Sequence, residues 1–501
     1  MSRRPNWLLG VLAALVLAPA AARAQATDWP RESPPRPLAA RPVDFPPYEL
    51  RTLKNGLQVL VVPHHEQPSV SFRLLVRAGA MQEPAGKPGV ASFVATLLNQ
   101  GTTTKSSGQI ASLIDSAGGI IGVGSGNELS NVYGAVIKDR TDLALGLAAD
   151  LVEHPAFSAD EIDRQRKQAL SALQVSYDDP DYIASLVFDR LVFGFHPYGR
   201  PNEGTPESIP RITRDDLVAF HHTWYVPNNS LLAIVGDLSV DEAFAAAERA
   251  FGGWARGDVP ATTPIDPPAP TRRIVVIDRP GSAQTEIRVG SLAVARTDQD
   301  YLTFDIATRI LGGEGANRLF GVLRTDRGLT YGASAELHAY KNAGELVAET
   351  DTRSAATGET LRLMVDEFAR LPREPVHAAE LRGAQDFVAG NFPLTIETPA
   401  AIAQQVLAEL FYGLDLHEIE TYRDRVDQVT AADIQRVARK FIRPDLLSIV
   451  LVGDASKFVD QLKSLGFGDF ERIPLSELDL NSPSLHRGGA GGGPPGGLPP
   501  A

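Results

Sequence analysis

The chain has 501 residues with a formal net charge of −13, 43% hydrophobic and 22% charged residues, and no cysteine. That hydrophobic share supports packed cores and excludes a chain that is disordered throughout. The lack of cysteine excludes disulfides, thiolate zinc sites, iron–sulfur clusters and a cysteine nucleophile. The acidic balance, without any dense Lys/Arg run, argues against a nucleic-acid partner.

The first 24 residues have the three parts of a secretory signal peptide. Arg3 and Arg4 precede an apolar run from Trp7 to Ala18, and Ala22-Arg23-Ala24 fits the small-residue rule for cleavage. The apolar run is shorter than the ~20 residues that a bilayer-spanning helix needs. We therefore predict a signal peptide over 1–24, export to the periplasm and no integral membrane segment after cleavage, with an uncleaved anchor helix as the alternative.

After a Pro- and Arg-rich lead-in, the first half of the chain alternates between two hydrophobic periods. A period of two residues is typical of half-buried strands, and a period near 3.6 is typical of amphipathic helices. These patterns predict strands at 57–63, 70–78, 120–126 and 129–136, and helices at 90–98, 107–117, 141–152 and 159–177. Neighbouring strands on short turns favour an antiparallel or mixed sheet with helices packed on one face, an α+β arrangement.

Two segments rich in Pro or Gly divide the chain. Residues 258–270 hold repeated prolines, which make a semi-rigid extended linker. Residues 481–501 are rich in Gly and Pro, bury little apolar surface, and are predicted to be a disordered tail. We therefore expect an N-terminal domain over 46–257 and a C-terminal domain over 271–475.

The two domains resemble each other in sequence. Positions that match at one fixed offset are 212–217 and 429–434, Pro227 and Pro444, and Gly236 and Gly453. Each copy predicts a helix, a Pro turn, a strand and a Gly-Asp turn, and Thr213 and Thr430 stand where a hydroxyl caps a helix start. A tandem duplication of one α+β domain explains these matches better than chance similarity between amphipathic segments.

Short motifs spread over residues 46–470 carry a resemblance to a known family. They are Lys54-Asn55-Gly56-Leu57, Arg77-Ala78-Gly79-Ala80, Gly89-Val90-Ala91, the run from His196 to Pro201 with Gly204-Thr205, and Val235-Gly236-Asp237. Together they make the chain resemble the insulinase/pitrilysin family of zinc metallopeptidases, as a half-size exported bacterial member. The resemblance implies two tandem homologous domains of the LuxS/MPP-like metallohydrolase fold, each a mostly antiparallel or mixed sheet with helices on one face.

The zinc motif of that family is degenerate in this chain. Active members resemble H-x-x-E-H on a helix, which places two His one turn apart beside the Glu that activates water. The corresponding positions are Ser92, Ala95 and Thr96, and the third ligand and an accessory Glu fall on Ala172 and Gln165. Hydroxyls and methyls are poor zinc ligands. The sequence therefore predicts no metal and no cofactor in this subunit, and the remaining histidines do not restore the motif.

The second domain keeps a pair of residues that the resemblance links to catalysis. Arg324 and Tyr331 fall on an Arg and a Tyr that face the zinc site in the family. A guanidinium and a phenol are donors that hold a scissile carbonyl and its developing oxyanion. The resemblance implies that both act in a partner's site. The alternative is a surface ion pair for Arg324 and a sheet-packed Tyr331.

The predicted strand at 120–126 corresponds to the sheet edge on which the family binds peptide. Extended peptides add to a sheet edge through main-chain hydrogen bonds, which makes Gly122, Val123 and Gly124 candidate substrate-binding residues. The family has Asn-Ala near Gly122-Val123, and glycines weaken a strand. Peptide docking on this edge is therefore left open.

These features lead to one functional prediction with two alternatives. We expect a zinc-less, non-catalytic subunit of a periplasmic heterodimeric metallopeptidase, whose HxxEH-bearing paralogous partner holds the zinc and which hydrolyses unstructured peptides. The first alternative is a non-proteolytic structural or peptide-binding homologue, such as a core-subunit-like scaffold. The second is an active zinc endopeptidase with atypical ligands.

Overall fold

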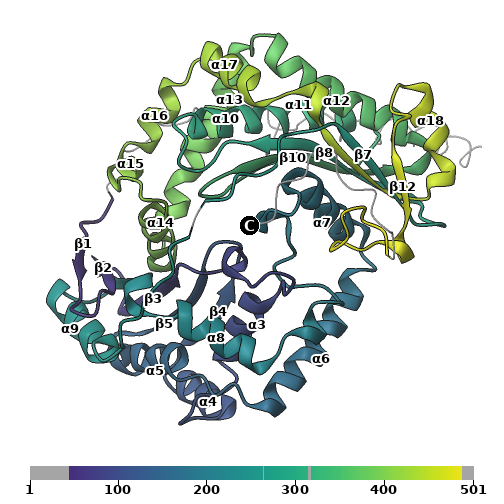
Figure 1. Ribbon diagram of the computed structural model, residues 1–501. Helices are drawn as coiled ribbons and strands as arrows, with labels where there is room; N and C mark the ends of the chain where they lie inside the picture. The colour runs from purple at the N-terminus through teal and green to yellow at the C-terminus, as the bar shows by residue number, and fades with distance from the viewer. Residues whose placement is uncertain (1–44, 263, 314–316, 488–501) are drawn as a thin grey trace, which may run out of the picture. The chain divides into compact units, whose positions relative to one another are not determined.

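Two six-stranded sheets form the framework of the residues that the computed structural model describes, 45–262, 264–313 and 317–487 (Figure 1). The strands of the first sheet are β1 (Glu49–Thr52), β2 (Gln58–Pro63), β3 (Ser69–Val76), β4 (Ile120–Ser125), β5 (Ser130–Ile137) and β6 (Ser230–Gly236). Those of the second are β7 (Arg273–Asp278), β8 (Gln284–Ala293), β9 (Ala333–Ala339), β10 (Gly344–Arg353), β11 (Ser448–Gly453) and β12 (Glu471–Pro474).

The helices follow the same division of the chain. The first half holds α3 (Val90–Leu98), α4 (Ser107–Ser116), α5 (Thr141–Glu153), α6 (Ala159–Ser176), α7 (Pro180–Phe193), α8 (Arg214–Trp224) and α9 (Val240–Phe251). The second half holds α10 (Tyr301–Gly312), α11 (Arg318–Phe320), α12 (Thr357–Arg373), α13 (Ala378–Asn391), α14 (Pro399–Tyr412), α15 (His417–Glu420), α16 (Tyr422–Gln428), α17 (Ala431–Phe441) and α18 (Val459–Ser464).

Five strands of each sheet share one topology, as a tandem duplication requires, whereas the outer strands differ: β1 is antiparallel to β2, and β12 is parallel to β7. The first sheet runs β1-β2-β6-β3-β5-β4 and the second β12-β7-β11-β8-β10-β9. The second and third strands of each order, β2 with β6 and β7 with β11, are parallel, and the pairs that follow are antiparallel. The predicted α+β class with mixed sheets is therefore confirmed.

The repeated helix start seen in the sequence is repeated in hydrogen bonds. The Thr213 hydroxyl accepts from the Asp216 amide at 3.3 Å, and the Thr430 hydroxyl accepts from the Asp433 amide at 3.2 Å. Each Asp carboxylate in turn accepts from the amide of its Thr, at 2.8 and 3.1 Å. Both helices, α8 and α17, thus begin with the same reciprocal cap, which satisfies amides that a helix leaves unpaired.

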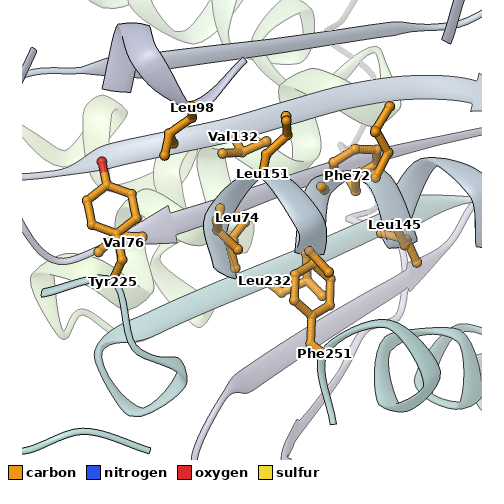
Figure 2. Packing of buried hydrophobic residues seen from close by; sticks show 14 of the residues in the cluster. Phe72, Leu74, Val76, Leu98, Val132, Leu145, Leu151, Tyr225, Leu232 and Phe251 are labelled. Atoms are coloured by element: carbon orange, nitrogen blue, oxygen red, sulfur yellow. The ribbon is translucent and has the colours of Figure 1, made fainter. Parts of the chain in front are cut away.

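Each sheet packs its own helices on one face. In the first core, Phe72 and Leu74 of β3 and Leu232 of β6 meet Leu145 of α5 and the end of α9 at Phe251 (Figure 2). The second core is built in the same way from β8 and β11 against α10, α12 and α17. Burying side chains of this size stabilises the fold by about 1.5–3 kcal/mol each.

The opposite face of each sheet is covered by a helix from the other half of the chain. Val406 and Leu407 of α14 pack on Leu60 of β2 and Leu231 of β6 (Figure 1). Reciprocally, α7 packs on β8 and β11 of the second sheet. The predicted helices on one face are thus joined by a crossing helix on the other, because central strands such as β6 and β11 are apolar on both faces and need cover on both.

The predicted tail begins too early. Within residues 481–487, Leu485 is only 1% exposed, and Arg190 of α7 donates to the carbonyls of Leu480 and Ser482 at 3.2 and 3.5 Å. A buried apolar side chain and two hydrogen bonds from a guanidinium therefore hold residues 481–487 in place. The prediction of disorder here followed from the Gly/Pro-rich composition of the residues beyond. The signal peptide over 1–24 and the rest of the tail lie outside the described residues.

In the part of the chain that the structure describes, no helix is both long and apolar enough to cross a bilayer.

Candidate functional site

A cavity of about 340 Å³ lies between α3 and α6 in the first domain. It is lined by Ser92 and Thr96 from α3 and by Gln165 and Ala172 from α6. Four positions that the sequence assigned to the degenerate zinc site therefore surround one space, although they come from two separate helices. Ala95, the fifth position, is buried on α3 with 1% of its surface exposed.

The start of α3 is held by a buried carboxyl group. Gly89 adopts φ +99°, a left-handed conformation that favours glycine, and leads directly into the helix. The amides of Gly89 and Ala91 donate to Glu83 Oε1 at 3.0 and 2.9 Å. Burial raises the pKa of Glu83 to about 8. The helix that carries the two ligand positions is therefore firmly placed, and Ser92 and Thr96 lie one turn apart on it.

The lining of this cavity does not fit a zinc ion. Zinc in proteins takes Cys, His or carboxylate ligands, whereas Ser92 and Thr96 offer neutral hydroxyls, Gln165 an amide and Ala172 a methyl group. Glu203 is the one carboxylate in the lining, and one carboxylate falls short of the three protein ligands of a catalytic zinc site. Across residues 45–262, 264–313 and 317–487, no group of three or more His, Asp or Glu side chains is placed to hold a metal ion. The residues present therefore disagree with the metal that the resemblance implies.

Arg324 and Tyr331 meet in the second domain. Arg324 lies in a π-helical turn (η6, Gly321–Asp326), a rare structure that is frequent at functional sites. Its guanidinium carbon lies 5.2 Å from the centroid of the Tyr331 ring, and its Nη1 donates to the Thr330 carbonyl at 3.2 Å. Tyr331 is 80% exposed and precedes β9, so the alternative of a sheet-packed tyrosine is wrong.

The loop that carries Tyr331 is anchored on both sides of it. Thr330 is buried, and its hydroxyl donates to the Gly332 carbonyl at 2.7 Å. The hydroxyl of Thr350, on β10, donates to the Thr330 hydroxyl at 2.9 Å. An exposed phenol therefore stands between two fixed backbone positions, which is the preorganisation that a hydrogen-bond donor for a reacting carbonyl requires.

The candidate peptide-binding strand, β4, lies at one edge of the first sheet. Gly122 stands opposite Tyr133 of β5, and a Cβ atom at Gly122 would overlap with the Tyr133 ring. Val123 packs against the first core, and a Cβ at Gly124 would lie 3.3 Å from Asn131 Nδ2. The glycine of this strand thus makes room for Tyr133, whose ring lies under the guanidinium of Arg73 at 5.2 Å.

Two family models divide the chain between them. The model described as insulinase (peptidase family M16) matches residues 58–205, and the model described as peptidase M16 inactive domain matches residues 211–387. A crystal structure of a peptidase M16 inactive domain from Pseudomonas fluorescens is 30% identical, with a TM-score of 0.77, and the match covers 81% of this chain and 98% of that one. The chain belongs to the insulinase (peptidase M16) family.

Other proteins match this chain over nearly their whole length. An uncharacterized zinc protease of Mycobacterium leprae is 27% identical over 413 residues, which is 81% of this chain and 92% of the relative. The uncharacterized zinc protease YmxG of Bacillus subtilis is 23% identical over 388 residues, 77% of this chain and 93% of the relative. A protease structure from Helicobacter pylori, at 21% identity and TM-score 0.76, shares the fold.

One residue near the candidate peptide edge was missed in the sequence. Tyr133 lies opposite Gly122 of β4, on the face of the sheet away from the first core, but the hydrophobic alternation of residues 129–136 marked it only as one member of a strand. The signal was present, because two strands on a short turn pair residue by residue, and an aromatic ring opposite a glycine is a recurring cross-strand arrangement. Pairing the two predicted strands would have placed Tyr133 over Gly122.

Proposed function

We propose that this M16 chain is the zinc-less subunit of a heterodimeric peptidase, in which Arg324 and Tyr331 complete the site of a zinc-bearing partner. The observation that carries the proposal is a contrast. The chain's own cavity presents hydroxyls, an amide and a methyl group, whereas the Arg324–Tyr331 pair is preserved, anchored and open to solvent. Donors held in this way are accessible to a second chain.

The chemistry of the pair suits a reacting peptide carbonyl. A guanidinium carries five N–H donors in a planar fork, and Arg324 uses one of its nitrogens for the Thr330 carbonyl. The Tyr331 phenol adds one O–H donor at the tip of an exposed ring. Donors aimed at the oxygen that gains charge stabilise the transition state more than the ground state. The zinc and its water would belong to the partner.

The setting of the complex follows from the rest of the chain. The signal peptide over 1–24 favours the periplasm as its place of action. An HxxEH-bearing paralogue is the partner that supplies the ligands missing at Ser92, Thr96 and Ala172. Unstructured peptides are the substrate class, because an extended chain is the form that adds to a sheet edge.

The test mixes the purified chain with an HxxEH-bearing paralogue and follows cleavage of an internally quenched, unstructured peptide. We expect turnover that depends on both chains. Arg324→Ala and Tyr331→Phe should each lower kcat/KM of the mixture by about 10²-fold or more, the usual cost of losing an oxyanion donor. Unchanged turnover in both variants would remove the assignment.

Arg327→Ala is the matched control for that experiment. Arg327 lies in the same segment, is exposed, and pairs with Glu359 at 3.6 Å rather than with Tyr331. Its truncation removes a positive charge near the proposed site without removing a proposed donor. We expect kcat/KM to stay within about twofold of the unmodified complex, since exposed ion pairs contribute little.

A second candidate is a structural homologue without peptidase function. One observation favours it: the Tyr133 ring, 5.2 Å from the Arg73 guanidinium, fills the space beside Gly122 on β4, the strand to which the resemblance assigns peptide docking. This candidate is favoured over the first if the chain and the paralogue form a stable complex that cleaves no unstructured peptide. In that case Tyr331→Phe should leave the stability of the complex unchanged.

A further inference from the structure

A second cavity, of about 600 Å³, lies in the second domain between α10, α13 and α14. Three cationic and three acidic side chains line it: Arg296, Arg309, Arg425, Asp305, Glu409 and Glu418. Neither the zinc-position cavity nor the Arg324–Tyr331 pair includes any of these residues. The proposed peptidase role therefore does not involve this cavity.

The second cavity is the repeat counterpart of the degenerate zinc cavity. Its helix α10 packs on the edge strand β9 and on α13, just as α3 packs on the edge strand β4 and on α6. Lining positions at matching spacings on the two pairs of helices are Ser92 and Asp305, Thr96 and Arg309, Ala169 and Val388, and Ala172 and Asn391. The duplicated backbone thus forms the same hollow twice, and the second copy carries charges at the two positions where the first carries hydroxyl groups.

The charged side chains of this cavity form ion pairs of different lengths. Arg296 Nη2 lies 2.8 Å from Glu409 Oε1, and Arg425 Nη1 lies 2.6 Å from Glu418 Oε2. Arg309 Nε lies 3.6 Å from Asp305 Oδ1, beyond good hydrogen-bond distance. The cavity is balanced in charge, and the Arg309–Asp305 pair has the most capacity for another partner.

Glu409 carries an unsatisfied oxygen beside this cavity. The residue is 3% exposed, and both Arg296 and Gln405 donate to its Oε1, the latter at 3.3 Å. Its Oε2 is buried and has no donor among the residues that the structure describes. Burial raises the pKa of both Glu409 and Asp305. A buried acceptor without a donor is costly, and this oxygen has almost no exposed surface, so the groups open to a ligand are those of the Arg309–Asp305 pair.

The mixture of charges decides between ligand classes. A metal ion is disfavoured by three guanidinium groups, and a simple anion is disfavoured by three carboxylates. A purely apolar ligand would leave the loosely paired Asp305 and Arg309 side chains without a closer polar partner. We propose that this cavity binds a small zwitterion, a free α-amino acid or a dipeptide, with its ammonium on Asp305 and its carboxylate on Arg309.

The remaining walls suit an apolar side chain on that ligand. Tyr301, Phe387 and Tyr422 line the cavity, and the Arg296 guanidinium lies 4.3 Å from the centroid of the Tyr301 ring. Aromatic walls with a few convergent charges are typical of small-molecule sites, and the volume lies within the roughly 300–1,000 Å³ that such sites occupy. Leucine, free or as the second residue of a dipeptide, is the matching probe.

The test is isothermal titration calorimetry of the purified full chain at neutral pH. The probes are leucine, the dipeptide Ala-Leu, N-acetyl-Ala-Leu and Ala-Leu amide. We expect one of the two zwitterions, leucine or Ala-Leu, to bind at a single site. Each blocked dipeptide should bind about tenfold more weakly or worse than the better-binding zwitterion, because it lacks one charge-assisted hydrogen bond. No binding of either zwitterion, or equal binding of the blocked forms, overturns the proposal.

Paired variants locate the site. Asp305→Asn and Arg309→Gln should each weaken binding of the better zwitterion by about tenfold or more. Ser92→Ala and Thr96→Val, at the equivalent positions of the first cavity, are the controls that should leave affinity unchanged. Circular dichroism confirms that each variant is folded. Affinity that is unchanged in both Asp305→Asn and Arg309→Gln overturns the assignment of this cavity.

Discussion

In the first domain, the cavity between α3 and α6 presents hydroxyls, an amide and a methyl group at the zinc-motif positions, and Glu203 is the one charged residue in its lining. In the second, the cavity between α10 and α13 presents three guanidinium groups and three carboxylates. The two hollows are made by the same pairs of elements in the same topological positions. Their contrast teaches that a repeated backbone decides where a cavity forms, whereas a few lining side chains decide what it can hold.

The largest effect is expected from returning zinc ligands to the first cavity. Ser92→His, Thr96→His and Ala172→Glu together place three ligands around one cavity. Because two nitrogens and a carboxylate are a sufficient protein set for zinc, we expect about one zinc per chain to be retained after dialysis. Elemental analysis measures it.

The corresponding triple change in the second domain sharpens the comparison. Asp305→His, Arg309→His and Asn391→Glu install the same ligand types, but Arg296 and Arg425 remain in the lining. Their positive charge opposes a divalent cation, so this variant should retain less zinc than the first. Equal retention by both triples would show that the local charge does not distinguish the cavities.

The next effect concerns the two helices that cross between the domains. Leu407 of α14 is fully buried against the first sheet, and Leu407→Ala should lower the free energy of unfolding by about 2–5 kcal/mol through lost burial and a residual cavity. Urea denaturation measures it. Leu394→Ala, at an exposed leucine just before α14, is the control and should change stability by no more than about 0.5 kcal/mol.

A loss for Leu407→Ala similar to that for Leu394→Ala would contradict the view that α14 is an integral cover of the first sheet. It would mean that the crossing helix contributes little, and that each domain is stabilised by the helices on its own face.

The smallest effect is a difference in pH dependence between the starts of α3 and α10. Burial raises the pKa of Glu83 to about 8, so its neutral form is favoured in the folded chain. Its contribution to stability is therefore complete below the unfolded value near 4.5 and is lost as the pH rises through about 8. Urea midpoints between these limits should fall with pH, and Glu83→Gln should flatten the slope.

Asp300, at the start of α10, is the matched control for that slope. Burial opposes its ionisation, but hydrogen bonds from Lys440 and Arg436 outweigh burial and hold its pKa below the usual value of 3.8. Its stabilising contribution is present above that value and is lost only as the pH falls through the lowered pKa. Asp300→Asn should thus leave the slope between pH 4.5 and 8 intact; a flattened slope in this variant would refute the assignment to Glu83.

Much of the local structure was predictable from the sequence. The helix predicted at 90–98 is α3 (Val90–Leu98), and the strand predicted at 120–126 is β4 (Ile120–Ser125). Hydrophobic periodicity and helix caps depend on residues only a few positions apart, so a short segment of the sequence is enough to recognise them. The same holds for Ser92 and Thr96, whose side-chain chemistry argues against a zinc ligand wherever the helix lies.

The helices that cross between domains were not predictable in the same way. Nothing in the segment 180–193 says that its apolar face belongs to β8 and β11 rather than to its own sheet. The position of Tyr133 over Gly122 likewise needed strand register, and the environment of Glu409 needed contacts to Arg296 from a distant loop. Such pairings are set by long-range packing, which short windows do not contain.

The amino-acid sequence by itself determined the duplicated α+β elements, the absence of zinc ligands at the motif positions and the retention of Arg324 and Tyr331, because these depend on residue type and local spacing. Only the tertiary structure decided that α7 and α14 exchange sheets, that Tyr331 stands free beside Arg324, and that a charged hollow mirrors the degenerate one. Those features come from contacts between residues far apart in the chain. The burial and the charge pairing of each side chain there depend on several segments at once.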